Sequence, residues 1–144
     1  MSPERFLNRE LSQLAFTDRV LAQAAREDVP LAERLRYVCI VSSILDEFFE
    51  VRMSDLIDEM IEAGGWRPAA PQWDSFVRIS ERAHALVERQ YRLFNEVITP
   101  ALEKRRIVIL SHAQRNSRQR KWVREYFERE VRPLLSPIGL DPSH

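Results

Sequence analysis

The segment from Leu31 to Ala63 places the strongest constraint on the fold, because it has the helical three- and four-residue apolar spacing on two sides. The first face consists of Leu35, Val38, Ser42, Leu45, Phe49, Met53, Leu56 and Met60. The second face lies roughly opposite and consists of Tyr37, Ile40, Val41, Ile44, Phe48 and Val51. A helix that is apolar on two sides must be covered on both, so the segment predicts a helix packed inside a larger helical fold.

The second apolar face has two alternative coverings. Burying one large apolar side chain stabilises a fold by about 1.5–3 kcal/mol, and a row of them left in water favours aggregation. Either the first and third predicted helices each cover one face, or part of the second face meets another domain or a ligand. Beyond Val51 this face becomes acidic, with Asp55, Asp58 and Glu62. Its apolar part is therefore confined to the first half of the helix.

Helical spacing continues on the N-terminal side of this segment. Asn8 is a candidate N-cap for a helix over residues 9–27, whose apolar face is interrupted by Asp18. Pro30 suits the first position of the next helix. Residues 64–72, rich in Gly and Pro, are expected to form a loop after it.

The second half of the chain predicts two more helices. One extends from Asp74 to Lys104, with Pro100 expected to kink or loosen its last turns. A shorter one extends from Ser117 to Val131. Its expected buried residues are Trp122, Val123, Tyr126, Phe127 and Val131. Between the two helices, the apolar run at residues 107–110 is a candidate strand.

These elements define the expected fold class. The chain of 144 residues contains only 3 glycines, which argues against a turn-rich β fold. We predict an all-α fold, a helical bundle of three long helices plus a shorter fourth. The segment after Arg132 is rich in proline and is expected to be a truncated, extended C-terminal tail.

Composition indicates a soluble, cytoplasmic protein. Apolar residues make up 44% of the chain and charged residues 31%, which is ordinary for a globular domain. The single cysteine, Cys39, cannot form an internal disulfide, so a reducing compartment and a place in the core are expected for it. No apolar run approaches the roughly 20 residues of a membrane span, and the N-terminus lacks the apolar stretch of a signal peptide.

The charge is zero overall but is distributed unevenly. Residues 104–124 contain 8 basic and no acidic side chains, whereas residues 1–103 contain 12 basic and 18 acidic ones. Arg is suited to bidentate contact with phosphate, so the basic segment is a candidate path for a polyanion. The candidate contacts are Arg105, Arg106, Arg115, Arg118, Arg120 and Lys121. The alternative is that the abundance of Arg reflects codon usage in a GC-rich genome.

The sequence also contains part of a metal-binding motif. Carboxylate bundles hold two metal ions with a Glu-x-x-His motif on each of two helices. Glu81 and His84 form one such motif, and the sequence contains no second one. Glu81 is also predicted to point away from the apolar side of its helix. We therefore predict no metal ligands and no catalytic residue in this chain.

Two long blocks of the sequence resemble a known family. They are "NRELSQLAFTDRVLAQA" and "VPLAERLRYVCIVSSILDEFFEVRM", and the end of the chain, "VRPLLSPIGLDPSH", continues the similarity. Together they resemble the N-terminal domain of the large polyphosphate kinases. The resemblance implies that residues 1–104 are the N-terminal helical domain and that residues 105–144 are the truncated beginning of the next domain.

The resemblance also implies a function for a longer parent protein. Family members transfer the terminal phosphate of ATP reversibly to inorganic polyphosphate, with Mg²⁺ and through a phosphohistidine in C-terminal domains. His84, His112 and His144 match none of the family's functional histidines. The chain alone is therefore expected to be inactive and to hold neither ATP nor Mg²⁺. The implied partners are ATP or ADP, polyphosphate and further copies of the full-length chain, with no nucleic acid; some members associate peripherally with membranes.

One departure from the family pattern concerns the nucleotide. The family's N-terminal domain caps the nucleotide site and places an asparagine near the adenine, directly before the "LDEFF" block. Ile44 occupies that position here, and Gln13 and Thr17 are further departures. Ile44 either still packs against an adenine face, or the contact is lost. A non-catalytic interaction module is the remaining alternative.

Overall fold

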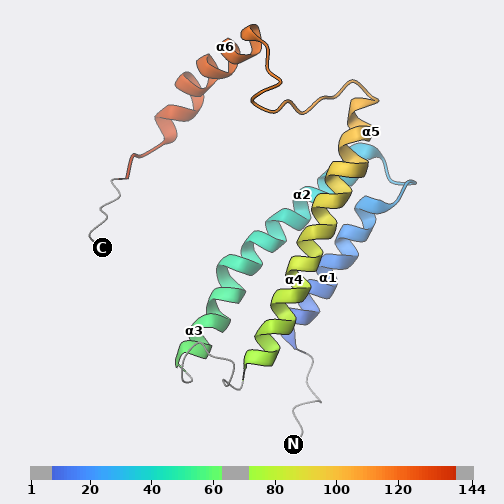
Figure 1. The fold of residues 1–144 in the computed structure, drawn as a ribbon, viewed down its shortest axis with the longest axis vertical. Coiled ribbons are helices and arrows are strands. Elements are labelled where there is room, and N and C mark those ends of the chain that lie inside the picture. Colours follow the sequence, from blue (N-terminus) through green and yellow to red (C-terminus); the bar gives the residue numbers. More distant parts are fainter. Residues whose placement is uncertain (1–7, 63–71, 139–144) are drawn as a thin grey trace, which may run out of the picture. The chain divides into compact units, whose positions relative to one another are not determined.

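The computed structural model describes residues 8–62 and 72–138 and divides the chain into two compact units, Met1–Ile107 and Val108–His144. Its described regular elements are all helical, as Figure 1 shows, which confirms the all-α prediction. The prediction of a strand at residues 107–110 is wrong, because these residues adopt no regular structure. In the described part of the chain they have no neighbouring strand with which to pair. The domain boundary at residue 104 stays a prediction.

The first unit begins with α1 (Arg9–Ala25), which starts where the sequence predicts. The Asn8 side chain accepts a hydrogen bond from the backbone N–H of Leu11 at 2.8 Å, which confirms Asn8 as the N-cap. After α1, Arg26 donates two hydrogen bonds to the carboxylate of Asp28. These bonds lower the pKa of Asp28. The next helix starts directly after Pro30, which serves as its N-cap residue.

The second helix is continuous but changes its winding. α2 (Leu31–Glu47) passes through a π-helical turn, η2 (Phe48–Met53), into α3 (Ser54–Glu62). Its buried side chains follow steps of three and four residues as far as Phe48, and the next buried one is Met53, five residues on. A π-helical turn closes hydrogen bonds over five residues instead of four, which accounts for the longer step. Ala63 and the predicted loop that follows lie outside the described residues, except for Gln72.

Part of the predicted face assignment is wrong where the π-helical turn begins. Uniform spacing places Phe49 on the first face and in the core, but Phe49 is 37% exposed. Its neighbour Phe48 is completely buried instead. Cys39, which was also expected in the core, is exposed.

The second apolar face is covered only in part. Val41 and Phe48 are fully buried, whereas Ile40 and Val51 stay exposed in this chain. Tyr37 and Ile44 are partly buried. The face therefore contributes two residues to the core and leaves an apolar margin on α2 and η2.

The third helix repeats the change of winding. α4 (Trp73–Leu93) continues through the π-helical turn η3 (Phe94–Ile98) into α5 (Thr99–Glu103). The loosened turn ends at Ile98, two residues before Pro100, whose ring nitrogen cannot donate the helical hydrogen bond. After α5, Arg106 adopts a left-handed conformation with φ of 64°. The backbone N–H groups of Arg106 and Ile107 bond the carbonyls of Glu103 and Leu102, which is the Schellman pattern of a helix end.

The core of the first unit lies where α1 packs against α2 and α4 (Figure 1). Two polar side chains tie the helices together within it. The Nε of Arg34 donates to the carbonyl of Ala24 at 2.8 Å, and the Nε2 of Gln90 donates to the carbonyl of Val38 at 3.0 Å. The buried apolar cluster consists of Leu14, Leu21, Ala24, Leu31, Val38, Val41, Leu45, Phe48, Met53, Ile79, Ala83, Leu86, Ile98 and Leu102.

The second unit contains α6 (Ser117–Tyr126), a π-helical turn η4 (Phe127–Val131) and a 3₁₀ turn η5 (Arg132–Leu134). The predicted helix is present, but its predicted burial is wrong. Trp122 is 61% exposed, and Tyr126 and Phe127 are also exposed. In residues 108–138 no second long element offers a surface on which the helix could bury them. Residues 135–138 have no regular structure, and the rest of the predicted tail lies outside the described residues.

Candidate polyanion-binding site

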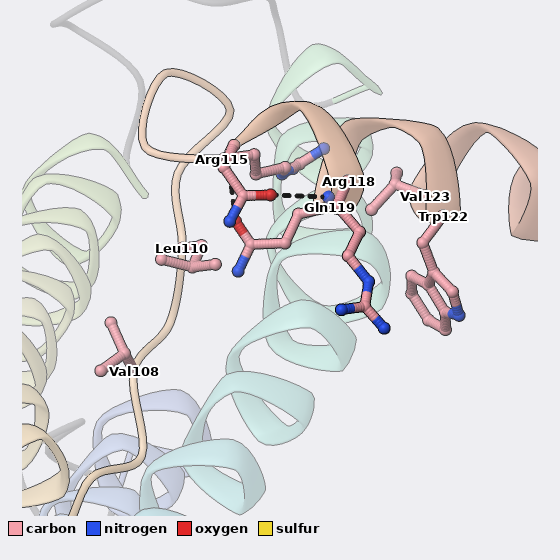
Figure 2. Close-up of a pocket in the computed structure, with 8 residues that line it drawn as sticks. Val108, Leu110, Arg115, Arg118, Gln119, Trp122 and Val123 are labelled. Atoms are coloured by element: carbon pink, nitrogen blue, oxygen red, sulfur yellow. Dashed lines mark hydrogen bonds between the residues drawn. The ribbon is translucent and has the colours of Figure 1, made fainter.

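A pocket of about 620 Å³ lies within the second unit, where the segment before α6 meets the first turns of that helix (Figure 2). Its lining combines basic, amide and apolar side chains and includes no carboxylate. The lining residues are Val108, Leu110, Arg115, Asn116, Arg118, Gln119, Trp122 and Val123.

A capping box builds the amide part of this pocket. The side-chain oxygen of Asn116 accepts from the backbone N–H of Gln119, and the side-chain oxygen of Gln119 accepts from the backbone N–H of Asn116, both at 2.9 Å. Each oxygen is therefore engaged in starting the helix. The amide nitrogens of both side chains remain as hydrogen-bond donors next to the guanidinium groups of Arg115 and Arg118.

Only some of the predicted polyanion contacts lie at this pocket. Arg115 and Arg118 line the pocket together. Arg120 is turned back on its own helix start, where its Nη1 donates to the carbonyl of Arg115 at 2.9 Å. Lys121 lies 3.7 Å from the carboxylate of Glu125 along α6. Arg105 and Arg106 belong to the first unit and are exposed at the end of α5, whereas the pocket lies wholly in the second unit.

The aromatic wall of the pocket was not anticipated as part of a site. Trp122 and Tyr126 are four residues apart on α6, and their rings stack with centroids 5.3 Å apart and planes 17° apart. Arg118 precedes Trp122 by the same interval, so the three side chains share one face of the helix. The spacing of these residues in the sequence was a usable signal, but helical periodicity assigned the two rings to a core instead.

The position of the predicted nucleotide contact is on α2 in the first unit. Ile44 is partly buried, one turn from the exposed Ile40 and one turn from the fully buried Phe48. Ile44 is thus at the border between the core and the apolar margin. A side chain at this position can contact a ligand or another domain on one side, and it packs against the core on the other.

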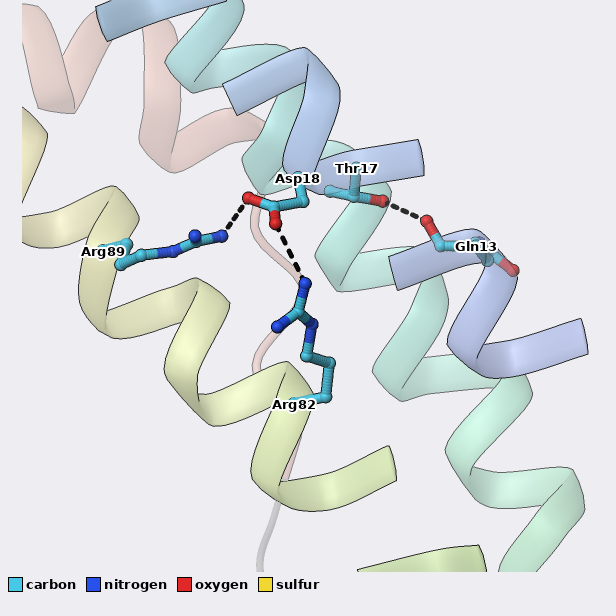
Figure 3. A network of polar contacts seen from close by, with 5 residues as sticks. All are labelled: Gln13, Thr17, Asp18, Arg82 and Arg89. Atoms are coloured by element: carbon cyan, nitrogen blue, oxygen red, sulfur yellow. Dashed lines mark hydrogen bonds and ion pairs between the residues drawn. The ribbon is translucent and has the colours of Figure 1, made fainter. Parts of the chain in front are cut away.

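A polar clamp between α1 and α4 was missed by the sequence analysis (Figure 3). Asp18 accepts a hydrogen bond from Arg82 at 3.1 Å through one carboxylate oxygen and another from Arg89 through the other. The Asp18 side chain is only 25% exposed. The interruption of the apolar face at Asp18 was the available signal, and the clamp explains why an acid is placed there.

Thr17, beside Asp18, is one of the departures from the family pattern. Its side chain is buried, and its hydroxyl donates to the carbonyl of Gln13, the other departure, at 2.9 Å. The bond satisfies the hydroxyl within α1, so the substitution is accommodated locally. Neither residue takes part in the pocket of the second unit.

The metal interpretation receives no support from the geometry of the described residues. Glu81 and His84 are both exposed on α4. The Nδ1 of His84 lies 2.8 Å from the carbonyl of Ser80, within its own helix. Across residues 8–62 and 72–138, no three His, Cys, Asp or Glu side chains gather closely enough to hold a metal ion. In the same residues, no helix has the length and apolar character required to cross a membrane.

Comparison with known proteins defines the class of the helical unit. Residues 6–110 match the family model described as the polyphosphate kinase N-terminal domain. A polyphosphate kinase of Neisseria gonorrhoeae is 49% identical over 142 residues, which is 97% of this chain and 21% of that protein. One of Burkholderia cenocepacia is 48% identical over 140 residues, covering 96% of this chain and 20% of the relative.

A solved structure agrees with these sequence matches. The crystal structure of polyphosphate kinase from Porphyromonas gingivalis aligns over 99% of this chain and 20% of its own, with a TM-score of 0.72 and 32% identity. The chain therefore belongs to the polyphosphate kinase N-terminal domain family. It spans about a fifth of the length of the relatives it matches.

Proposed function

We propose that this chain is the N-terminal part of an enzyme that transfers the terminal phosphate of ATP to inorganic polyphosphate. The family membership carries this proposal, because the matched relatives are polyphosphate kinases and the similarity covers almost the whole chain. In the parent protein the remaining four fifths carry the histidine that becomes phosphorylated, the residues that bind Mg²⁺ and most of the phosphate contacts. The described residues of this chain contribute structure and charge.

The helical unit serves as a cap beside the nucleotide in this proposal. Its core and its polar clamp hold α1, α2 and α4 together, and an apolar margin includes Ile40 on α2 and Val51 on η2. Ile44 lies at the edge of that margin, where the family places an asparagine. An isoleucine can pack against the face of a purine but cannot hydrogen-bond its edge. The nucleotide contact here is therefore apolar.

The basic segment serves as a contact surface for polyphosphate. Arg115 and Arg118 line one pocket that contains no carboxylate, so their positive charge is not neutralised within it. Arg105 and Arg106 are exposed at the end of α5 and add to the same charge excess along the chain. Arginine pairs with phosphate oxygens through two parallel hydrogen bonds, and polyphosphate offers many such oxygens.

An activity assay tests the proposal. Labelled ATP and Mg²⁺ are incubated with the full-length parent protein or with the 144-residue chain, and polyphosphate is then extracted. We expect label in polyphosphate only with the parent protein, because the chain has no Gly-rich phosphate loop and no histidine that matches the phosphoryl carrier. Absence of label with the parent protein would contradict the proposed activity. Label with the short chain, above a heat-inactivated control, would contradict its proposed auxiliary role.

A further inference from the structure

A buried amide joins α4 to α2 within the first unit, where the two helices lie side by side (Figure 1). The side chain of Gln90 is only 6% exposed. Its Nε2 donates to the carbonyl of Val38 at 3.0 Å and to the hydroxyl of Ser42 at 2.6 Å. Both acceptors lie on α2, about one helical turn apart. Donor and acceptors all belong to the first unit, so these bonds need no other part of a longer protein.

Apolar packing around this amide is incomplete. A pocket of about 220 Å³ lies between the two helices here, and Gln90 and Ser42 are its amide and hydroxyl groups among otherwise mainly apolar lining residues. Apolar contact has no preferred direction, whereas a hydrogen bond weakens steeply when its angle changes. The two bonds of Gln90 therefore fix the spacing of α2 from α4 and the rotation of α2 about its own axis.

The rotation of α2 decides where Ile44 points. Ser42 and Ile44 are two residues apart, which is about 200° around a helix, so their side chains leave α2 on nearly opposite sides. Ile44 is partly buried, whereas its neighbours Val41 and Phe48 are fully buried. A small rotation of α2 in one direction would bury Ile44, and a rotation in the other would move it away from the border of the core.

We propose that Gln90 is a positioning residue for the nucleotide. Its two hydrogen bonds to α2 hold Ile44 at the border of the core, where Ile44 can pack against the adenine. The inference rests on the proposed function, which places Ile44 beside the nucleotide. Gln90 is buried and bonds the opposite side of α2, so it acts through Ile44 and touches no substrate. Loss of its bonds should weaken the binding of ATP and leave the chemical step, which other domains carry out, unchanged.

Steady-state kinetics of the full-length parent enzyme test this inference. Gln90→Leu keeps a buried side chain of similar size and removes the donor. We expect the KM for ATP to rise roughly three- to tenfold, the effect of one misplaced apolar contact, with kcat and the KM for polyphosphate unchanged. Ser42→Ala removes one of the two bonds at an exposed residue, so it should fold normally and raise the KM for ATP by about twofold.

Arg34→Met is the matched control. Arg34 also joins α2 to a neighbouring helix through a buried hydrogen bond, to the carbonyl of Ala24, but it lies ten residues before Ile44, about 15 Å along the axis. Its loss should lower the melting temperature and leave the KM for ATP unchanged. An equal rise in this KM for Arg34→Met and Gln90→Leu would reflect a general loss of stability and would overturn the inference.

A double variant tests whether Gln90 acts through Ile44. Gln90→Leu combined with Ile44→Ala should have the KM for ATP of Ile44→Ala alone, because the side chain that Gln90 positions is already absent. Fully additive effects would overturn the inference, and so would an unchanged KM in Gln90→Leu. If Gln90→Leu does not fold, an unchanged KM in Ser42→Ala would overturn it instead. An unaltered parent enzyme without activity would contradict the proposed function and this inference with it.

Discussion

The first unit and the second unit use helices in different ways. In the first, α1, α2 and α4 bury a continuous apolar cluster and are joined by polar side chains from different helices. In the second, α6 buries none of its side chains, and its aromatic and basic groups face outward. The difference indicates that the first unit holds its own fold, whereas the second offers its side chains to other molecules or to other parts of a longer protein.

The largest expected effect comes from a buried core residue of the first unit, and it tests whether burial differs between the two units as described. Phe48→Ala should lower the free energy of unfolding by about 3–5 kcal/mol, because it removes a fully buried ring from the core. Chemical denaturation followed by circular dichroism measures the change. Phe49→Ala is the matched control on the adjacent residue and should cost clearly less, since Phe49 is partly exposed. Phe127→Ala in the second unit should change stability by less than about 1 kcal/mol. Equal losses for Phe48 and Phe49 would contradict the different burial of the two rings.

The polar clamp gives the next largest effect. Asp18→Asn should destabilise the first unit by about 1–2 kcal/mol, between the values for exposed and buried ion pairs, because Asp18 binds two arginines at a partly buried position. Glu88→Gln is the control, since Glu88 pairs with Arg92 along α4 with both side chains largely exposed, and the substitution should cost less than about 0.5 kcal/mol. Urea titration of both variants distinguishes them. If Asp18→Asn lowered the free energy of unfolding no more than Glu88→Gln, apolar packing alone would join α1 to α4.

Comparing sequence with structure shows which physical signals are local. The Asn8 cap and the starts of the helices depend on neighbouring residues, so the sequence predicts them correctly. The apolar spacing gives no sign of the π-helical turn that begins at Phe48, and uniform periodicity placed Phe49 on the core face, where the structure buries Phe48 instead. The exposure of Trp122 could not be foreseen either, because an apolar helix face does not show which surface covers it. For the candidate site, the charge of the basic segment was visible in the sequence, whereas the fold was required to show that only Arg115 and Arg118 of the six predicted contacts line one pocket.

The end of α5 offers a smaller effect of opposite sign. Arg106 holds a left-handed conformation, which glycine adopts without the clash of a Cβ atom. Arg106→Gly should therefore stabilise the first unit by up to about 1 kcal/mol. Thermal melting measures the shift. Arg105→Gly at the preceding residue, which has no positive φ, should not stabilise the unit. A loss of stability in Arg106→Gly would contradict the Schellman end of this helix.

The smallest expected effect concerns the border of the core. Ile44 is partly buried, so Ile44→Asn leaves its new amide in reach of water and should lower the melting midpoint by less than roughly 4 °C. Val41→Asn, three residues earlier and fully buried, is the control and should cost much more because its amide would be buried without a partner. A fall of more than about 4 °C for Ile44→Asn would identify Ile44 as a core residue, and its proposed place beside the nucleotide would then be wrong.

Mapping polyphosphate onto the backbone tests the division of roles between the units most directly. Backbone amide shifts of the 144-residue chain are recorded by NMR during titration with inorganic polyphosphate at low and at moderate salt. The account predicts changes concentrated in residues 105–124 that weaken strongly as salt screens the charges. Changes spread over α1, α2 and α4, or changes indifferent to salt, would contradict it.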